Sequence, residues 1–126
     1  MSLETKFNSW LEQINQEENP KTDIIAFYFG LFEKPNGFSM YLIGSKEYYD
    51  DDDDWACNND FEPENKYMEF PTEFSEGKGW EEILNAAKKL IKDYTESDNF
   101  LNSIFKNAKA IVTGFDDGDL ILIKSK

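Results

Sequence analysis

The feature that most constrains the fold is an apolar run at residues 24–32, which comprise Ile-Ile-Ala-Phe-Tyr-Phe-Gly-Leu-Phe. Successive side chains of a strand point to opposite faces of its sheet, so this run gives a strand two apolar faces. Such a pattern is typical of a strand that is covered at least partly on each side. The chain is therefore predicted to form a sheet with this segment near its centre.

Four other segments carry a strand pattern, and turn residues lie between them. They are residues 38–44, 66–70, 108–115 and 120–123. Pro35-Asn36-Gly37 favours a hairpin into the first of these, because proline fixes φ and glycine tolerates positive φ. Asp117-Gly118 favours a two-residue primed turn between the last two strands. We interpret the carboxylates of that turn as structural.

Three segments carry helical signals. Apolar residues recur at three- and four-residue spacings over residues 3–17, and Asn19-Pro20 should end that helix because proline lacks an amide donor. A seven-position apolar stripe from Trp80 to Tyr94 predicts a second helix. A third, shorter helix is expected after Ser97-Asp98-Asn99, since each of these side chains can cap a helix N-terminus.

The order of these elements predicts an α+β domain spanning residues 1–126, because strands and helices are segregated along the chain. We expect a mostly antiparallel sheet of four or five strands with two or three helices packed on one face. The expected core residues are Phe27, Phe29, Leu42, Trp80, Leu84, Leu90, Ile91, Ile111 and Leu122.

The charge balance restricts the function. The chain has 13 basic and 26 acidic residues, a formal charge of -13, and neither histidine nor arginine. Such a charge disfavours direct binding to nucleic acid or to an anionic membrane. Without histidine there is no imidazole base, and without arginine there is no guanidinium clamp for a phosphate. We therefore expect a binding protein and not an enzyme.

The location is expected to be cytoplasmic. The first residues lack the pattern of a secretory signal, and no apolar stretch approaches the ~20 residues of a membrane span. Cys57 is the only cysteine, so it has no partner for an internal disulfide, as is usual in a reducing compartment. We expect a monomer or a weak dimer.

The segment from Glu47 to Glu64 is the candidate functional site. It contains nine acidic residues, no basic residue and several aromatic ones. Merely solubilising acidic runs usually lack aromatic residues, whereas Tyr and Trp often anchor interfaces. The candidate partner-binding residues are Tyr48, Tyr49, Asp50, Asp51, Asp52, Asp53, Asp54, Trp55 and Asp60. Tyr49 and Trp55 are the expected aromatic anchors.

Two other interpretations of this segment remain open. It could be a solvated loop whose aromatic residues pack under the sheet, as charge runs are often only surface. It could also bind calcium through Asp50–Asp54, but an EF-hand loop needs alternating ligands and glycine at its sixth position, where Trp55 stands. We therefore predict no metal and no cofactor.

The Asp23–Phe32 strand, the Pro35-Asn36-Gly37 hairpin and the acidic Tyr48–Cys57 segment of this histidine-free chain resemble the small cytosolic immunity proteins of bacterial polymorphic-toxin systems. The resemblance implies that the chain binds a cognate toxin domain and blocks it. A nuclease toxin would suit an acidic inhibitor, because its basic cleft attracts polyphosphate. The main alternative is a non-catalytic adaptor, with a carboxylate-based enzyme as a third hypothesis.

Overall fold

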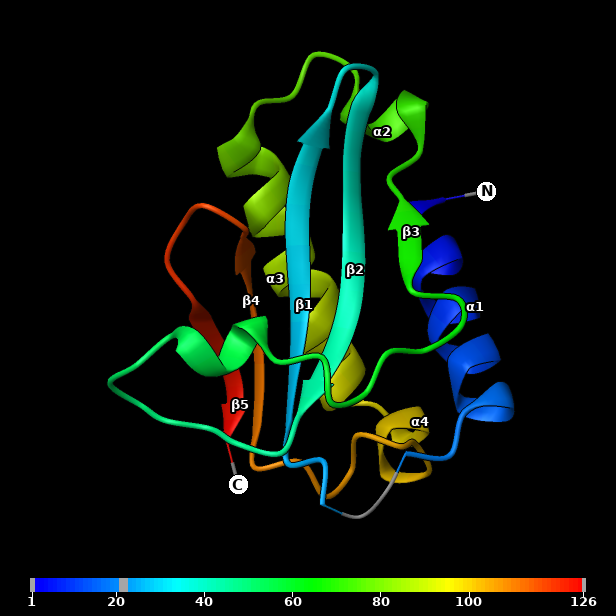
Figure 1. Cartoon of the computed structure of the whole chain (residues 1–126). Helices are drawn as coiled ribbons and strands as arrows, with labels where there is room; N and C mark the ends of the chain where they lie inside the picture. Colours follow the sequence, from blue (N-terminus) through cyan, green and yellow to red (C-terminus); the bar gives the residue numbers. More distant parts are fainter. Residues whose placement is uncertain (1, 21–22, 126) are drawn as a thin grey trace.

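A computed structural model describes residues 2–20 and 23–125. Its sheet has five strands in the order β3-β2-β1-β4-β5 (Figure 1). Their bounds are β1 Ala26–Lys34, β2 Gly37–Ser45, β3 Tyr67–Glu69, β4 Ala110–Phe115 and β5 Ile121–Ser125. The pair of β1 and β4 is parallel and the other three pairs are antiparallel. The predictions of an α+β fold and of a central strand at the apolar run are confirmed.

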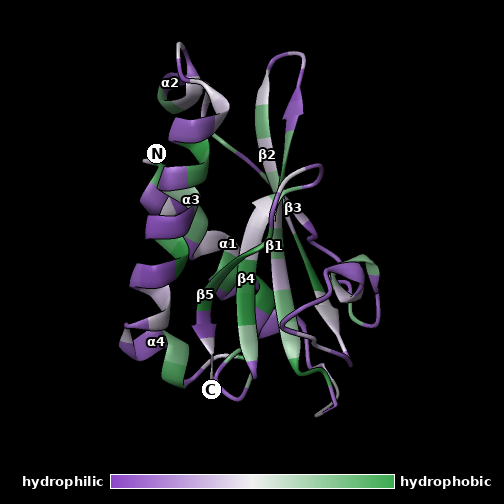
Figure 2. Ribbon diagram, turned by 90° about the vertical axis from the view of Figure 1, so that its left-hand side faces the viewer, coloured by the Kyte–Doolittle hydropathy of each residue, from purple (hydrophilic) through white to green (hydrophobic). Residues whose placement is uncertain are grey.

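The helices cover one face of this sheet, here called the helix face (Figures 1 and 2). Their bounds are α1 Leu3–Glu17, α2 Thr72–Ser75, α3 Trp80–Thr95 and α4 Asp98–Leu101. The hydroxyl of Ser2 caps α1 by accepting from the amide of Thr5 at 3.1 Å. None of the described helices is both long and apolar enough to cross a membrane.

The opposite face, here called the loop face, carries the segment that includes the 3-10 helix η1 at Asp54–Cys57 (Figure 2). The two faces have separate apolar clusters. Phe27 and Phe29 of β1 point to the helix face and pack against Phe105, with Phe27 and Phe105 centroids 4.8 Å apart. Tyr28 of β1 points to the loop face and packs with Trp55. Both sets of β1 side chains are therefore covered, as the run predicted.

The expected core is wrong at two positions, Trp80 and Leu122, which are 56% and 48% exposed. Leu84 and Leu90 are half-buried. The buried positions of α3 are Ile83, Ala87, Ile91, Tyr94 and Thr95. Trp80 lies on the same side of the helix as this row, but it is the first residue of α3 and sits beside Phe115 at the end of β4, so it is left at the edge of the interface. Leu122 pairs with Val112 on the edge strand β5, which has no neighbouring strand on one side within the part of the chain that the structure describes.

The connection from β4 to β5 is also different from the expected two-residue turn. Five residues, 116–120, separate the strands, and within the described chain positive φ occurs only at Gly37, Gly77 and Gly114. Gly118 therefore cannot supply the primed turn, which needs positive φ. Gly114 has φ +152°, and a Cβ there would lie 2.5 Å from the carbonyl oxygen of Asp119. The loop folds closely over Gly114, which only glycine permits.

The packing of α3 gives a first test by paired substitutions. We expect Ile83→Ala to lower the free energy of unfolding by about 2–5 kcal/mol, because it leaves a cavity under a fully buried side chain. Leu84→Ala should cost clearly less, since Leu84 is only half-buried. Urea denaturation of both variants measures the difference. An equal or larger loss at Leu84 would mean that α3 is rotated relative to this packing.

Candidate protein-docking surface

The acidic segment Glu47–Glu64 is closed at its base by the end of β2. Gly44 and Phe61 exchange two backbone hydrogen bonds of 2.8 and 3.1 Å. The carboxylate of Asp60 accepts from the amide of Lys46 at 2.9 Å. Asp60, one of the predicted partner-binding residues, therefore helps to close the loop. At the far end of the segment, the indole of Trp10 donates to the Asn65 carbonyl at 2.7 Å.

Trp55 fixes the middle of the segment to the sheet. Its side chain is 2% exposed and lies in the loop-face cluster with Tyr28, Ile43 and Val112. The ring of Tyr48 packs edge-on against it, with centroids 5.3 Å apart. Trp55, one of the two expected aromatic anchors, is therefore buried and not part of the exposed surface, because the loop face of β1 needs an apolar cover and Trp55 supplies it. Tyr48, also a predicted contact residue, is half-buried in the same way.

The other predicted contact residues form a projecting tip. Tyr49 is 50% exposed, and Asp50 to Asp54 are all exposed. Within the tip, the carboxylate of Asp52 accepts from the amide of Asp54 at 2.9 Å. No lysine in the described ranges forms an ion pair with these five aspartates. The ion pairs found there join Lys34–Glu69, Lys46–Asp23, Lys66–Glu62 and Lys89–Asp93.

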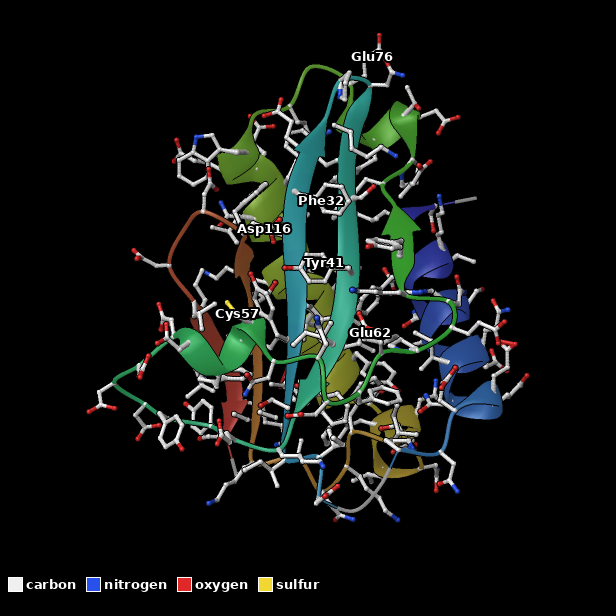
Figure 3. All side chains as sticks on the ribbon, in the orientation of Figure 1. Phe32, Tyr41, Cys57, Glu62, Glu76 and Asp116 are labelled. Carbon is white, nitrogen blue, oxygen red and sulfur yellow. The ribbon has the colours of Figure 1, made fainter. Side chains whose placement is uncertain are left out.

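Beside η1 lies a groove of about 540 Å³ that sequence reasoning missed. Phe32, Tyr41 and Tyr67 come from three neighbouring strands and contribute aromatic rings with centroids 6.1–6.3 Å apart. Ala56 and Cys57 of η1 form its opposite side. Figure 3 shows Phe32, Tyr41 and Cys57 on the same face of the sheet. We call this feature the aromatic groove.

The aromatic groove depends on strand register. Tyr41 is opposite Gly30 on β1 and Tyr67 on β3. A Cβ at Gly30 would lie 2.2 Å from the Tyr41 ring, so glycine there lets this ring lie flat across β1. The strand pattern of residues 38–44 was visible in the sequence. The pairing that brings the three rings together was not.

Hydrogen bonds fix Tyr28 and Tyr41 on the loop face. Tyr28 donates its hydroxyl to the Gly114 carbonyl at 2.9 Å, and Tyr41 donates its hydroxyl to the Asp116 carboxylate. Burial, reinforced by Asp116, raises the pKa of both hydroxyls well above the usual value. They therefore remain neutral hydrogen-bond donors near neutral pH and are not poised as bases.

Lys66 lies over this surface with its ammonium 5.7 and 5.6 Å from the centroids of the Tyr41 and Tyr67 rings. It also pairs with Glu62 at 2.6 Å. The rings therefore already hold one cation, as the negative face of an aromatic ring favours. Across the parts of the chain that the structure describes, no group of three or more carboxylates or thiols is arranged to hold a metal ion. What the arrangement offers is contact area and negative charge.

Comparisons with protein-family models, with curated proteins and with solved structures found no match to this chain.

The role of Trp55 can be tested by replacing its side chain with that of alanine. We expect Trp55→Ala to cost about 3–5 kcal/mol of unfolding free energy and to free the acidic segment for cleavage by an endoprotease specific for aspartate. Tyr49→Ala, at an exposed site on the same segment, serves as the control and should stay within roughly 0.5 kcal/mol of wild type. Equal protease resistance in the two variants would show that Trp55 does not hold the segment.

The buried tyrosines predict a loss of stability in alkali. A group whose pKa is raised by folding stabilises the folded state fully below its unfolded pKa, and this contribution declines as pH rises above that value. We expect the urea midpoint of wild type to fall above about pH 10, the ordinary tyrosine pKa. The fall should be shallower in Tyr28→Phe, with each protein referenced to its own midpoint at pH 7. If the urea midpoints of the two proteins fell in parallel with pH, Tyr28 would not be a source of the alkaline loss of stability.

Proposed function

We propose that this chain is a cytoplasmic immunity-type inhibitor that binds and neutralises a cognate bacterial toxin domain. The contact surface consists of the tip residues Tyr49 and Asp50–Asp54 together with the adjacent aromatic groove. The observation that carries the proposal is a run of exposed aspartates that have no lysine partner among the described residues. It lies on a segment that is closed at its base and packed onto the sheet.

Charge repulsion supports this proposal. Five successive carboxylates repel one another, and this repulsion destabilises the free protein by an amount that a cationic partner can offset. Backbone bonding at Gly44–Phe61 and burial of Trp55 fix the segment before binding. A preformed surface loses less conformational entropy when it associates. The segment therefore favours a specific partner over a purely solubilising role.

The sign of the charge suggests the class of toxin. A nuclease attracts polyphosphate with a basic cleft, so an acidic surface can occupy the same cleft and accelerate encounter by electrostatic steering. Carboxylates of the tip would take the place of phosphates. Tyr49 and the rings of Phe32 and Tyr67 would supply the close contacts, since aromatic residues often contribute most of the binding energy.

An adaptor role is the second candidate, and a different observation favours it. Leu122 is exposed on β5, which forms one edge of the sheet. An edge strand can pair with a strand of another protein through backbone groups. Binding of that kind would depend on the β5 edge and not on the charge of the acidic tip.

Kinetics can test the inhibitor proposal once co-purification has identified the cognate toxin domain, for which the product of an adjacent gene is the first candidate. We expect Asp51→Asn, Asp52→Asn and Asp53→Asn together to slow association by about tenfold at low salt and to flatten its salt dependence. Tyr49→Ala should mainly accelerate dissociation. The measurement is surface plasmon resonance at two ionic strengths, with the residual activity of the toxin as a second readout.

A charge-matched control separates local from total charge. Glu4→Gln, Glu12→Gln and Glu17→Gln remove three negative charges from α1, on the helix face, and should change association far less than the tip variant. If both triple variants slowed association equally, the association rate would depend on net charge and not on the position of the aspartates. Kinetics unchanged by the tip and Tyr49 variants would exclude this surface and favour the β5 edge.

A further inference from the structure

A second groove, of about 870 Å³, lies where β1, α3 and the β4–β5 loop meet. Leu31, Leu84 and Phe115 give it an apolar lining, and Trp80 stands at its side. The indole of Trp80 packs edge-on against Phe115, with centroids 6.3 Å apart. We call this feature the Trp80 groove. It is separate from the acidic segment, none of whose residues lines it.

The exposure of Trp80 sets this groove apart. Trp80 is 56% exposed, whereas Trp10 and Trp55 are 5% and 2% exposed. Tryptophan next to an apolar groove is the residue type that most often dominates the energy of a protein interface. The packing of α3 does not require it, because Ile83 and Ala87 fill the interface below.

The charge around the groove has one sign. Glu33, Asp116, Asp117 and Asp119 line it, and no lysine does so among the described residues. An apolar surface surrounded by carboxylates complements a segment that combines large aliphatic side chains with lysine or arginine. It disfavours an acidic segment and a phosphate-bearing ligand equally.

The backbone of β1 suggests the conformation of that segment. β4 pairs with β1 only as far as Leu31, whose carbonyl accepts from the Asp116 amide at 3.0 Å. β1 continues to Lys34, beyond the end of β4 (Figure 1). Because backbone groups alternate between the two sides of a strand, those of Glu33 point to the same side as those of Leu31. They are therefore directed at the groove, where an added strand could pair with them.

We propose that the Trp80 groove binds an extended segment of a partner protein in which a large aliphatic side chain is flanked by lysine or arginine. The aliphatic side chain packs on Trp80, Leu84 and Phe115. The flanking cations face Glu33, Asp117 and Asp119, and the segment's backbone pairs with Glu33. This inference does not require the partner to be a toxin.

The probe for this site is an acetylated and amidated heptapeptide of alternating lysine and leucine. We expect its binding to shift the tryptophan emission to shorter wavelength, because Trp80 alone of the three indoles is exposed. A heptapeptide with glutamate in place of lysine should not bind. Trp80→Ala should weaken binding at least tenfold by calorimetry, and Trp80→Phe should retain most of it.

Charge-matched variants distinguish the effect of the carboxylates at the Trp80 groove from that of the negative charge of the whole protein. Asp117→Asn with Asp119→Asn should weaken the lysine-leucine peptide about tenfold, whereas Asp51→Asn with Asp53→Asn should weaken it less than twofold. Equal weakening by the two pairs, or unchanged affinity in Trp80→Ala, would overturn the proposal. The peptide experiment uses no toxin, so its failure leaves the kinetic test of the acidic tip intact.

Discussion

The packing of Trp55 onto the loop face of the sheet is the contact on which the rest of the surface depends. A central strand with two apolar faces is stable only when both are covered, and the helices cover one. On the other face, Tyr28, Ile43 and Val112 are buried with Trp55. The same residue that completes the core therefore sets the position of η1, of the acidic tip before it and of one side of the aromatic groove after it.

This arrangement places the destabilising part of the molecule next to a stabilising contact. Burial of Trp55 removes a large apolar surface from water, while the neighbouring aspartates are exposed and repel one another. Without an inward-facing aromatic residue the acidic run would move away from the sheet, and its charges would not keep a fixed relation to the aromatic groove. A fixed charge pattern is what allows a surface to select one partner and orientation.

The sequence predicted the fold better than it predicted the surface, for identifiable reasons. The apolar faces of residues 24–32 depend only on the twofold period of a strand, so the central position of β1 could be inferred locally. The stripe of α3 located the helix and its buried face, but not how far the sheet extends under it, and Trp80 at the first position of α3 is left exposed. Composition alone located the acidic segment. The inward direction of Trp55 could not be predicted, because it depends on the loop face of β1 needing an apolar cover. To predict the aromatic groove, the register of three strands would have had to be known.

Asp116 lines both grooves, and its hydrogen bonds connect residues of one groove to residues of the other. Its amide donates to the Leu31 carbonyl at the end of the β1–β4 pairing, and its carboxylate accepts the hydroxyl of Tyr41 from the aromatic groove. A carboxylate has two oxygens, each able to accept more than one hydrogen bond. Asp116 can therefore keep Tyr41 in place and still face a cation. Phe32 lines both grooves as well, so a partner bound across the end of β1 would meet one continuous surface of rings and carboxylates.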